Sequence, residues 1–121
     1  MIDDDKAIRE AFTLALEDTE YQVETVESGE KGLKKTQTTK YDLIFLDLKM
    51  PGMNGVKTLR ELQKIDKDVP VYLITAFHKE FFDELAAAEE EGMNFEVVKK
   101  PISSDQIIVI IKSILEKPQT F

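Results

Sequence analysis

Short apolar runs alternate with longer amphipathic segments along the chain, and this alternation restricts the fold more than any other feature. Residues 42–47, 69–75 and 95–98 form such runs, and residues 21–26 form a weaker one. Continuous apolar runs of this length are typical of strands that are buried on both faces. Strands that alternate with helices imply right-handed crossovers and a parallel sheet with helices on both faces. The sequence therefore predicts a doubly wound α/β domain.

Five helices are expected around these runs, because apolar residues between them repeat at helical spacing. Ile8, Phe12 and Leu16 form this pattern in the first helix. The last segment is β-branched enough to form a strand by propensity alone. Ser103 and Gln106 have the spacing of a capping box, which favours a helix there. The expected caps or ends of the other helices are Ser28, Asn54 and Gly92.

Composition excludes several classes of function. The chain has 121 residues, of which 24 are acidic and 16 basic, for a net charge of -8. This length fits one domain, and the negative charge argues against a phosphate-binding face for nucleic acid. The absence of cysteine and the single histidine, His78, exclude a disulfide scaffold, a thiol nucleophile and a Cys-based or multi-His metal centre. No apolar run approaches the roughly 20 residues that span a bilayer, so a cytoplasmic protein is expected.

Polar side chains stand where the predicted strands end. Asp3 and Asp4 follow the first apolar residues, Asp47 and Thr75 end two buried runs, and Lys100 follows the last run. Ligands of parallel α/β sheets bind beyond the carboxyl ends of the strands. We therefore expect three carboxylates, one hydroxyl and one ammonium group to meet at one edge of the sheet.

This cluster predicts phosphoryl chemistry with a metal ion. Two carboxylates about 4 Å apart repel by roughly 4 kcal/mol at an effective dielectric constant of 20, so a cation is needed among them. Oxygen ligands suit Mg²⁺. Asp47 is the candidate nucleophile for an aspartyl phosphate, and Asp3, Asp4 and Asp47 are the candidate metal ligands. Lys100 would pair with the phosphoryl charge and Thr75 would donate a hydrogen bond to it.

Each of these residues also has a simpler structural interpretation. Asp3 and Asp4 could form a solvated turn or a helix cap, and Asp47 could be a turn residue. Thr75 could be a structural strand end, and Lys100 could be an ordinary surface charge. The functional interpretation rests on their joint occurrence, because separate strand ends each present a residue type that the chemistry requires.

Four motifs resemble those of the receiver domain of bacterial response regulators, over nearly the whole chain. They are residues 2–9, 46–55, 74–76 and 100–101, and the second is the most specific. The resemblance implies a flavodoxin-like, five-stranded parallel sheet in the order 2-1-3-4-5. It implies a receiver domain over residues 1–117, with 118–121 as a C-terminal tail or the start of a linker.

The resemblance also implies the roles of single residues. Asp47 would be the phosphoacceptor for a sensor histidine kinase or a phosphotransfer protein, with Mg²⁺ as cofactor and no separate enzymatic substrate. Arg9 stands five residues after Asp4, as in the family, which selects Asp3 and Asp4 as the acidic pair and leaves Asp5 as a helix cap. The remaining implied roles are the backbone carbonyl of Lys49 as a metal ligand, Thr75 as the switch hydroxyl and Lys100 as the phosphate-facing lysine.

Two features depart from the family pattern. Only Met1 and Ile2 precede the acidic pair, where the family has a full strand, so the first strand is expected to be truncated, with upstream residues missing from this sequence. The segment between Thr75 and Lys100 is longer than in the family. This leaves the aromatic switch position open: it is either Phe95 or has become Val97.

The resemblance implies a partner-binding switch. Phosphorylation of Asp47 would repack the face formed by the fourth helix, the fifth strand and the last helix, which could also mediate a homodimer. This domain would bind neither nucleic acid nor membrane. Lys49 and Phe77 lie two residues after Asp47 and Thr75, and we expect them to screen the phosphoryl group and slow its hydrolysis.

Three other functions are weighed against this one. A Mg²⁺-dependent aspartyl-phosphate phosphatase of the haloacid dehalogenase type would have a second acid where Lys49 stands. A flavin-binding electron carrier would have a Ser/Thr/Gly-rich loop in place of the three aspartates at residues 3–5. A receiver-like interaction module without phosphorylation would normally lack Asp47, Thr75 or Lys100.

Overall fold

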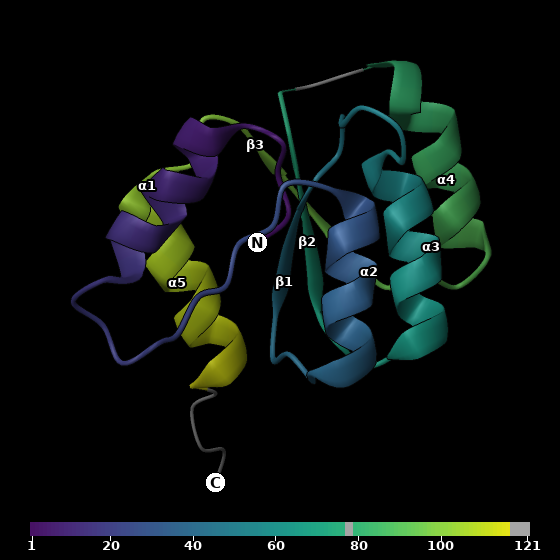
Figure 1. The fold of residues 1–121 in the computed structure, drawn as a ribbon. Helices are drawn as coiled ribbons and strands as arrows, with labels where there is room; N and C mark the ends of the chain where they lie inside the picture. Colours follow the sequence, from purple (N-terminus) through teal and green to yellow (C-terminus); the bar gives the residue numbers. More distant parts are fainter. Residues whose placement is uncertain (77–78, 117–121) are drawn as a thin grey trace, which may run out of the picture.

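The molecule is a three-layer arrangement with a parallel sheet in the middle. The computed structural model describes residues 1–76 and 79–116. Within them, strands β1 (Ile44–Asp47), β2 (Val71–Thr75) and β3 (Glu96–Lys99) pair in the order β1-β2-β3. Figure 1 shows α1 and α5 on one face of the sheet and α2, α3 and α4 on the other. The helices are α1 (Lys6–Leu16), α2 (Gly29–Thr38), α3 (Gly55–Ile65), α4 (Phe82–Glu90) and α5 (Ser104–Leu115), and a short 3-10 helix (Lys79–Phe81) precedes α4. The predicted doubly wound fold is confirmed.

The first two expected strands are each reduced to a single bridge. Ile2 pairs in parallel with both Val26 and Leu46, so the spatial order of the five strand positions is 2-1-3-4-5. The Ile2 N–H donates to the Phe45 carbonyl over 2.8 Å, and the Asp47 N–H donates to the Ile2 carbonyl over 2.8 Å. These bonds place the acidic pair beside the end of β1.

The prediction of a strand over residues 21–26 is wrong except at Val26. The Val26 N–H donates to the Met1 carbonyl, and its own carbonyl accepts from the Asp3 N–H over 3.1 Å. A strand is held by a row of such bonds to a neighbouring strand. Among the described residues, this segment forms its bridging backbone bonds only with Met1 and Asp3, so a single bridge is present.

Each face of the sheet has its own apolar cluster. On the α1 and α5 side, the rings of Phe12 and Phe45 meet edge to face with centroids 5.0 Å apart. On the other side, Leu46 and Leu73 are fully buried beneath α2, α3 and α4. The predicted burial of residues 95–98 on both faces is wrong, because β3 pairs only with β2 and most of its residues are exposed.

The expected helix caps are confirmed. The side chains of Asp5, Ser28 and Asn54 each accept a backbone N–H in the first turn of their helices, over 2.9, 3.2 and 2.9 Å. Ser103 and Gln106 form the reciprocal bonds of a capping box, which resolves the ambiguous last segment as a helix. Among the described residues, no helix is long and apolar enough to cross a membrane.

Gly55 lies where α3 comes closest to the segment that follows β1. A Cβ at this position would lie 2.6 Å from the Asp47 carbonyl oxygen and 2.7 Å from the Leu48 Cα. Because both obstacles are backbone atoms, Gly55→Ala must displace this segment or the helix. We expect the free energy of unfolding to fall by about 1–3 kcal/mol, measured by urea denaturation.

Gly32→Ala is the matched control for this prediction. Gly32 is also a buried helix glycine, but a Cβ there would meet the flexible end of the Ile2 side chain. That side chain can turn aside, and alanine favours the helix by about 1 kcal/mol, so the net change should be small. Equal losses in the two variants would contradict the proposed close approach of backbones at Gly55.

Candidate functional site

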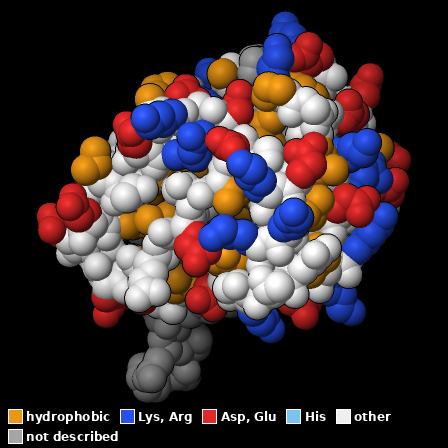
Figure 2. Space-filling view, viewed as in Figure 1, with side chains coloured by type: hydrophobic (Ala, Val, Ile, Leu, Met, Phe, Trp, Pro, Cys, Tyr) orange, Lys and Arg blue, Asp and Glu red, His pale blue; other side chains and the backbone are white. Residues whose placement is uncertain are grey.

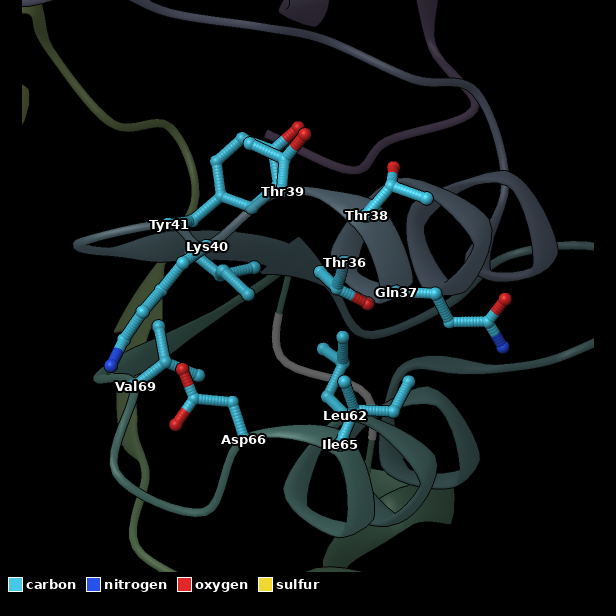
Figure 3. Close-up of a pocket in the computed structure, with 11 residues that line it drawn as sticks. Thr36, Gln37, Thr38, Thr39, Lys40, Tyr41, Leu62, Ile65, Asp66 and Val69 are labelled. Atoms are coloured by element: carbon cyan, nitrogen blue, oxygen red, sulfur yellow. The ribbon is translucent and has the colours of Figure 1, made fainter.

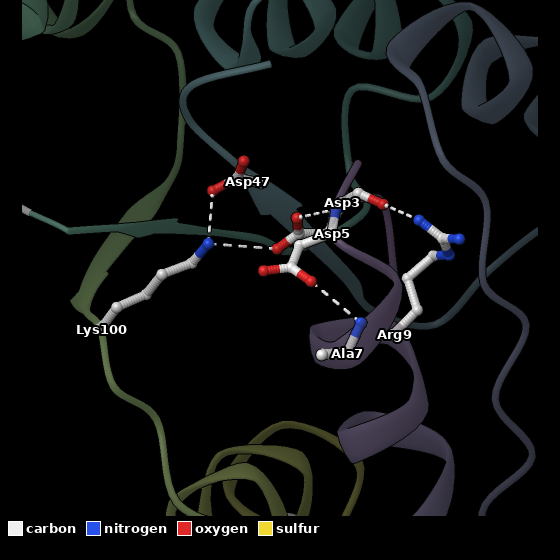
Figure 4. Close-up of polar contacts among 6 residues, drawn as sticks. All are labelled: Asp3, Asp5, Ala7, Arg9, Asp47 and Lys100. Carbon is white, nitrogen blue, oxygen red and sulfur yellow. Dashed lines mark hydrogen bonds and ion pairs between the residues drawn. The ribbon is translucent and has the colours of Figure 1, made fainter. Parts of the chain in front are cut away.

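Acids and a lysine from distant parts of the chain meet at the carboxyl edge of the sheet (Figure 4). The Lys100 Nζ lies 3.0 Å from the Asp47 Oδ1 and 3.2 Å from the Asp3 Oδ2. Asp3, Asp4 and Asp47 each place one carboxylate oxygen within 4.8 Å of the others. The structure thus brings four of the sequence-predicted site residues into one cluster.

Strand register explains why these residues meet. Asp47 is the last residue of β1 and pairs with Ile74, so Thr75 ends the neighbouring strand one position further on. Lys100 follows β3, and its N–H donates to the Thr75 carbonyl over 2.7 Å. Thr75 is buried, at 6% exposure. The predicted switch hydroxyl therefore stands at the end of the strand between those that carry Asp47 and Lys100.

The described side chains of the other predicted residues lie outside this cluster. The Lys49 Nζ forms an ion pair with the Glu80 carboxylate over 3.2 Å, and both side chains are more than half exposed. Phe95 packs against the apolar cluster under α3 and α4, whereas Val97 on β3 is 48% exposed. The residues that lie outside the described part of the chain are Phe77, His78 and residues 117–121, which include the expected tail 118–121.

The electrostatic environment of the pocket shifts three pKa values. Burial raises the pKa of Asp47 to about 6, with the Lys100 ammonium opposing and the Asp3 carboxylate adding to the shift. Burial also raises the pKa of Asp3, against the hydrogen bond from the Asp5 N–H and the charge of Lys100. Burial lowers the pKa of Lys100, but its ion pairs with Asp47 and Asp3 outweigh this, so the pKa lies above its usual value.

The raised pKa of Asp47 predicts a stability cost above neutral pH. In the unfolded chain this carboxyl ionises near pH 3.8, whereas in the folded state it holds its proton up to about pH 6. The free energy of unfolding should therefore fall as pH rises through this window, by about 3 kcal/mol in total at 1.36 kcal/mol per pKa unit.

Asp47→Asn removes this cost, because the amide carries no charge. In urea denaturation with EDTA present, we expect the variant to be more stable than the parent above pH 6 and nearly equal to it near pH 4. If the difference in stability between Asp47→Asn and the parent were the same at both pH values, burial of the Asp47 charge would not be the cause of that difference.

The donor set fits a divalent cation. Asp3, Asp4 and Asp47 offer oxygen atoms only, which suit hard cations such as Mg²⁺. Three carboxylates face one ammonium group, so a divalent charge would balance the excess negative charge. Asp3 and Asp47 are buried and Asp4 is exposed, which leaves one side of the cluster open to solvent.

Sequence analysis missed two contacts that support the acids. The Arg9 Nη1 donates to the Asp3 carbonyl over 2.8 Å, and the Asp5 N–H donates to the Asp3 Oδ1 over 2.9 Å. The spacing between Asp4 and Arg9 identified which two aspartates form the acidic pair, but it did not predict this contact. The acceptor is a backbone carbonyl, which every residue has, so the residue types give no indication of the hydrogen bond.

A separate pocket of about 420 Å³ lies at the other end of the sheet (Figure 3). Its residues include Ile44, the first residue of β1, and Val69, which precedes β2, so it lies at the amino ends of the strands. It contains none of the acids of the cluster. The lining residues are Thr36, Gln37, Thr38, Thr39, Lys40, Tyr41, Ile44, Leu62, Ile65, Asp66 and Val69.

The fold and the cluster of acids around Lys100 together define a flavodoxin-like α/β domain with an acidic, lysine-bridged site at the carboxyl edge of its sheet. The family model of the response regulator receiver domain matches residues 1–112. The chain belongs to this family.

Similar proteins agree with this assignment. The chain is 33% identical over 117 residues to the transcriptional regulatory protein GlrR of Escherichia coli strain K12, covering 97% of this chain and 26% of GlrR. It is 30% identical over 119 residues to the alkaline phosphatase synthesis transcriptional regulatory protein PhoP of Bacillus subtilis strain 168, covering 98% of this chain and 48% of PhoP. The chain therefore spans half or less of these two curated relatives.

Solved structures show the same fold. A CheY-like response regulator receiver domain protein from Methanospirillum hungatei JF-1 superposes with a TM-score of 0.84 at 24% identity, covering 96% of this chain and 90% of that one. This likeness confirms the flavodoxin-like architecture of the chain.

Proposed function

We propose that this receiver domain accepts a phosphoryl group on Asp47 from a phosphohistidine of a sensor histidine kinase or a phosphotransfer protein. Mg²⁺ would be held by Asp3, Asp4, Asp47 and the backbone carbonyl of Lys49. The observation that carries the proposal is the position of the Asp47 carboxylate, 3.0 Å from the Lys100 ammonium within a cluster of three acids. Membership of the receiver family supports it.

The proposed transfer is a displacement at phosphorus. A carboxylate oxygen of Asp47 forms a bond to phosphorus as the bond from phosphorus to the imidazole nitrogen breaks, and the electron pair returns to that nitrogen. With a pKa of about 6, Asp47 is ionised and nucleophilic at neutral pH. Lys100 stays protonated and pairs with the phosphoryl oxygens, and Thr75 donates a hydrogen bond to them. Mg²⁺, when bound, supplies positive charge that offsets the negative charge of these groups.

The proposed output is a change in the face formed by α4, β3 and α5. Each of these elements has an exposed apolar side chain, namely Phe82 at 47%, Val97 at 48% and Val109 at 65% exposure. Phosphorylation would draw Thr75 toward Asp47 and repack this face. The repacking would either promote or prevent the formation of a homodimer through this face. Light scattering with and without beryllofluoride, a phosphoryl mimic, tests this, and an unchanged mass would count against a dimer switch.

We propose no nucleic-acid binding by this domain and no separate enzymatic substrate. The net charge is -8, and acidic and basic side chains are interspersed over the face shown in Figure 2. The net negative charge disfavours binding along a phosphate backbone. We place the domain in the cytoplasm. Any regulation of transcription, as in the names of its relatives, would need a further domain.

Incubation with acetyl phosphate and Mg²⁺, followed by intact-mass measurement, tests the proposed function. The expected result is a gain of one phosphoryl group that is lost on incubation in acid or base, as an acyl phosphate should be. EDTA should prevent the gain. No added mass with Mg²⁺, or the same gain with EDTA, would refute the proposed metal-dependent acceptor site.

A further inference from the structure

The turn that carries the acidic pair is held at three points (Figure 4). The Asp5 N–H donates to the Asp3 Oδ1 over 2.9 Å, and the Asp5 carboxylate accepts from the Ala7 N–H over 2.9 Å. The half-buried Arg9 reaches back from α1, and its Nη1 donates to the Asp3 carbonyl over 2.8 Å. The first helix and the acidic turn are thus joined by side chains as well as by the chain itself.

Asp4 depends on this turn more than Asp3 does. The Asp3 carboxylate is held directly, by the Asp5 N–H and by Lys100. Within residues 1–76 and 79–116, the exposed Asp4 carboxylate has no hydrogen bond or ion pair, yet it lies within 4.8 Å of the Asp3 and Asp47 oxygens. No described side chain holds it in place, so the backbone of the turn determines the position from which it can reach the cluster.

We propose that Arg9 is a positioning residue for the metal-binding acids, an inference that rests on the metal site proposed above. By holding the Asp3 carbonyl, the Arg9 guanidinium keeps the turn in the shape that aims the Asp4 carboxylate at the ion. Because it binds a carbonyl rather than a carboxylate, it leaves the charges of Asp3 and Asp4 available to a cation. Groups that orient metal ligands in this way commonly change metal affinity by about 10–100-fold when removed.

The positive charge of Arg9 and its positioning role affect Mg²⁺ affinity in opposite directions. The guanidinium repels a nearby cation, so if only its charge mattered, removing Arg9 would tighten Mg²⁺ binding. Loss of positioning weakens binding. The sign of the change therefore separates the two roles.

A Mg²⁺ titration of ¹⁵N-labelled protein, followed by amide NMR shifts without acetyl phosphate, provides the test. Arg9→Gln should raise the dissociation constant about ten-fold. Arg9→Lys should retain most of the affinity, because an ammonium can donate to the same carbonyl. The matched control is Lys6→Gln, which removes a cation from the same helix. Within the described part of the chain, this cation pairs only with the exposed Glu10. The Mg²⁺ affinity of this variant should be unchanged or slightly tighter.

A second comparison tests whether Arg9 acts through Asp4. In an Asp4→Ala background, Arg9→Gln should cause no further loss of Mg²⁺ affinity, because coupled residues are not additive. A full further loss in that background would contradict the proposed route.

The outcomes distinguish this inference from the proposed function. A parent protein that does not bind Mg²⁺ would refute the metal site itself. A parent that binds Mg²⁺, with Arg9→Gln equal or tighter, would overturn only the role of Arg9, as would a lower melting temperature with unchanged affinity. Should Arg9→Gln not fold, Arg9→Met keeps the apolar stem in place, and failure of both variants to fold would assign Arg9 to folding instead.

Discussion

Asp47→Asn is expected to abolish phosphoryl uptake from acetyl phosphate in the presence of Mg²⁺. An amide is a far weaker nucleophile than a carboxylate, and the new side chain has almost the same size. The surrounding apolar and polar contacts should therefore persist while the chemistry is lost. Intact-mass measurement under the conditions that phosphorylate the parent checks this result.

Asp42→Asn is the matched control for this variant. Asp42 is exposed and precedes β1, so the same change of charge is made at the opposite end of the same strand. This variant should gain one phosphoryl group, as the parent does. A phosphoryl group on Asp47→Asn that is as labile as that of the parent would place the acceptor elsewhere.

Lys100→Met is expected to cause the largest loss of stability within the pocket. It leaves the Asp3 and Asp47 carboxylates, which are 0% and 7% exposed, without their shared cation. Breaking a fully buried ion pair costs about 3–5 kcal/mol. Because 21% of the Lys100 side chain is exposed, we expect a smaller loss at pH 8, of about 2–3 kcal/mol in the free energy of unfolding.

The loss should depend on the charge of the acids. It should shrink at pH 5, where the Asp47 carboxyl, with a pKa of about 6, takes up a proton, and in the double variant with Asp47→Asn. The matched control is Lys49→Met, which breaks an ion pair between two exposed side chains and should cost less than about 1 kcal/mol. Equal losses in Lys100→Met and Lys49→Met would contradict a charge-balancing role for Lys100.

Much of the pocket could be predicted because parallel strands place their carboxyl ends at one edge. To place each site residue, the sequence had only to predict the carboxyl end of its strand. An error at the amino end of the strand did not change the predicted site. The strand of Asp47 begins at Ile44 rather than at residue 42, yet its last residue is unchanged. Helix caps were equally accessible, because Ser28 and Asn54 act on backbone groups only three residues away.

The features that sequence analysis missed depend on neighbours distant along the chain. The segment at 21–26 has strand-like residues but only a short partner beside it. Val97 was expected in a buried strand and is exposed because β3 lies at the edge of the sheet. The ion pair of Lys49 with Glu80 joins charged side chains across loops, where no spacing rule applies. The contact of Arg9 with Asp3 is local, but its acceptor is a backbone carbonyl, which every residue has, so residue type does not reveal it.

The assignment of the phosphoryl group to Asp47 can be tested by locating the modified residue. Borohydride reduces an acyl phosphate to an alcohol, which marks the acceptor permanently for peptide sequencing by mass spectrometry. After treatment with acetyl phosphate and Mg²⁺, we expect to find the reduced residue at position 47. A mark on Asp3, Asp4 or any other acid, with Asp47 unmodified, would contradict it.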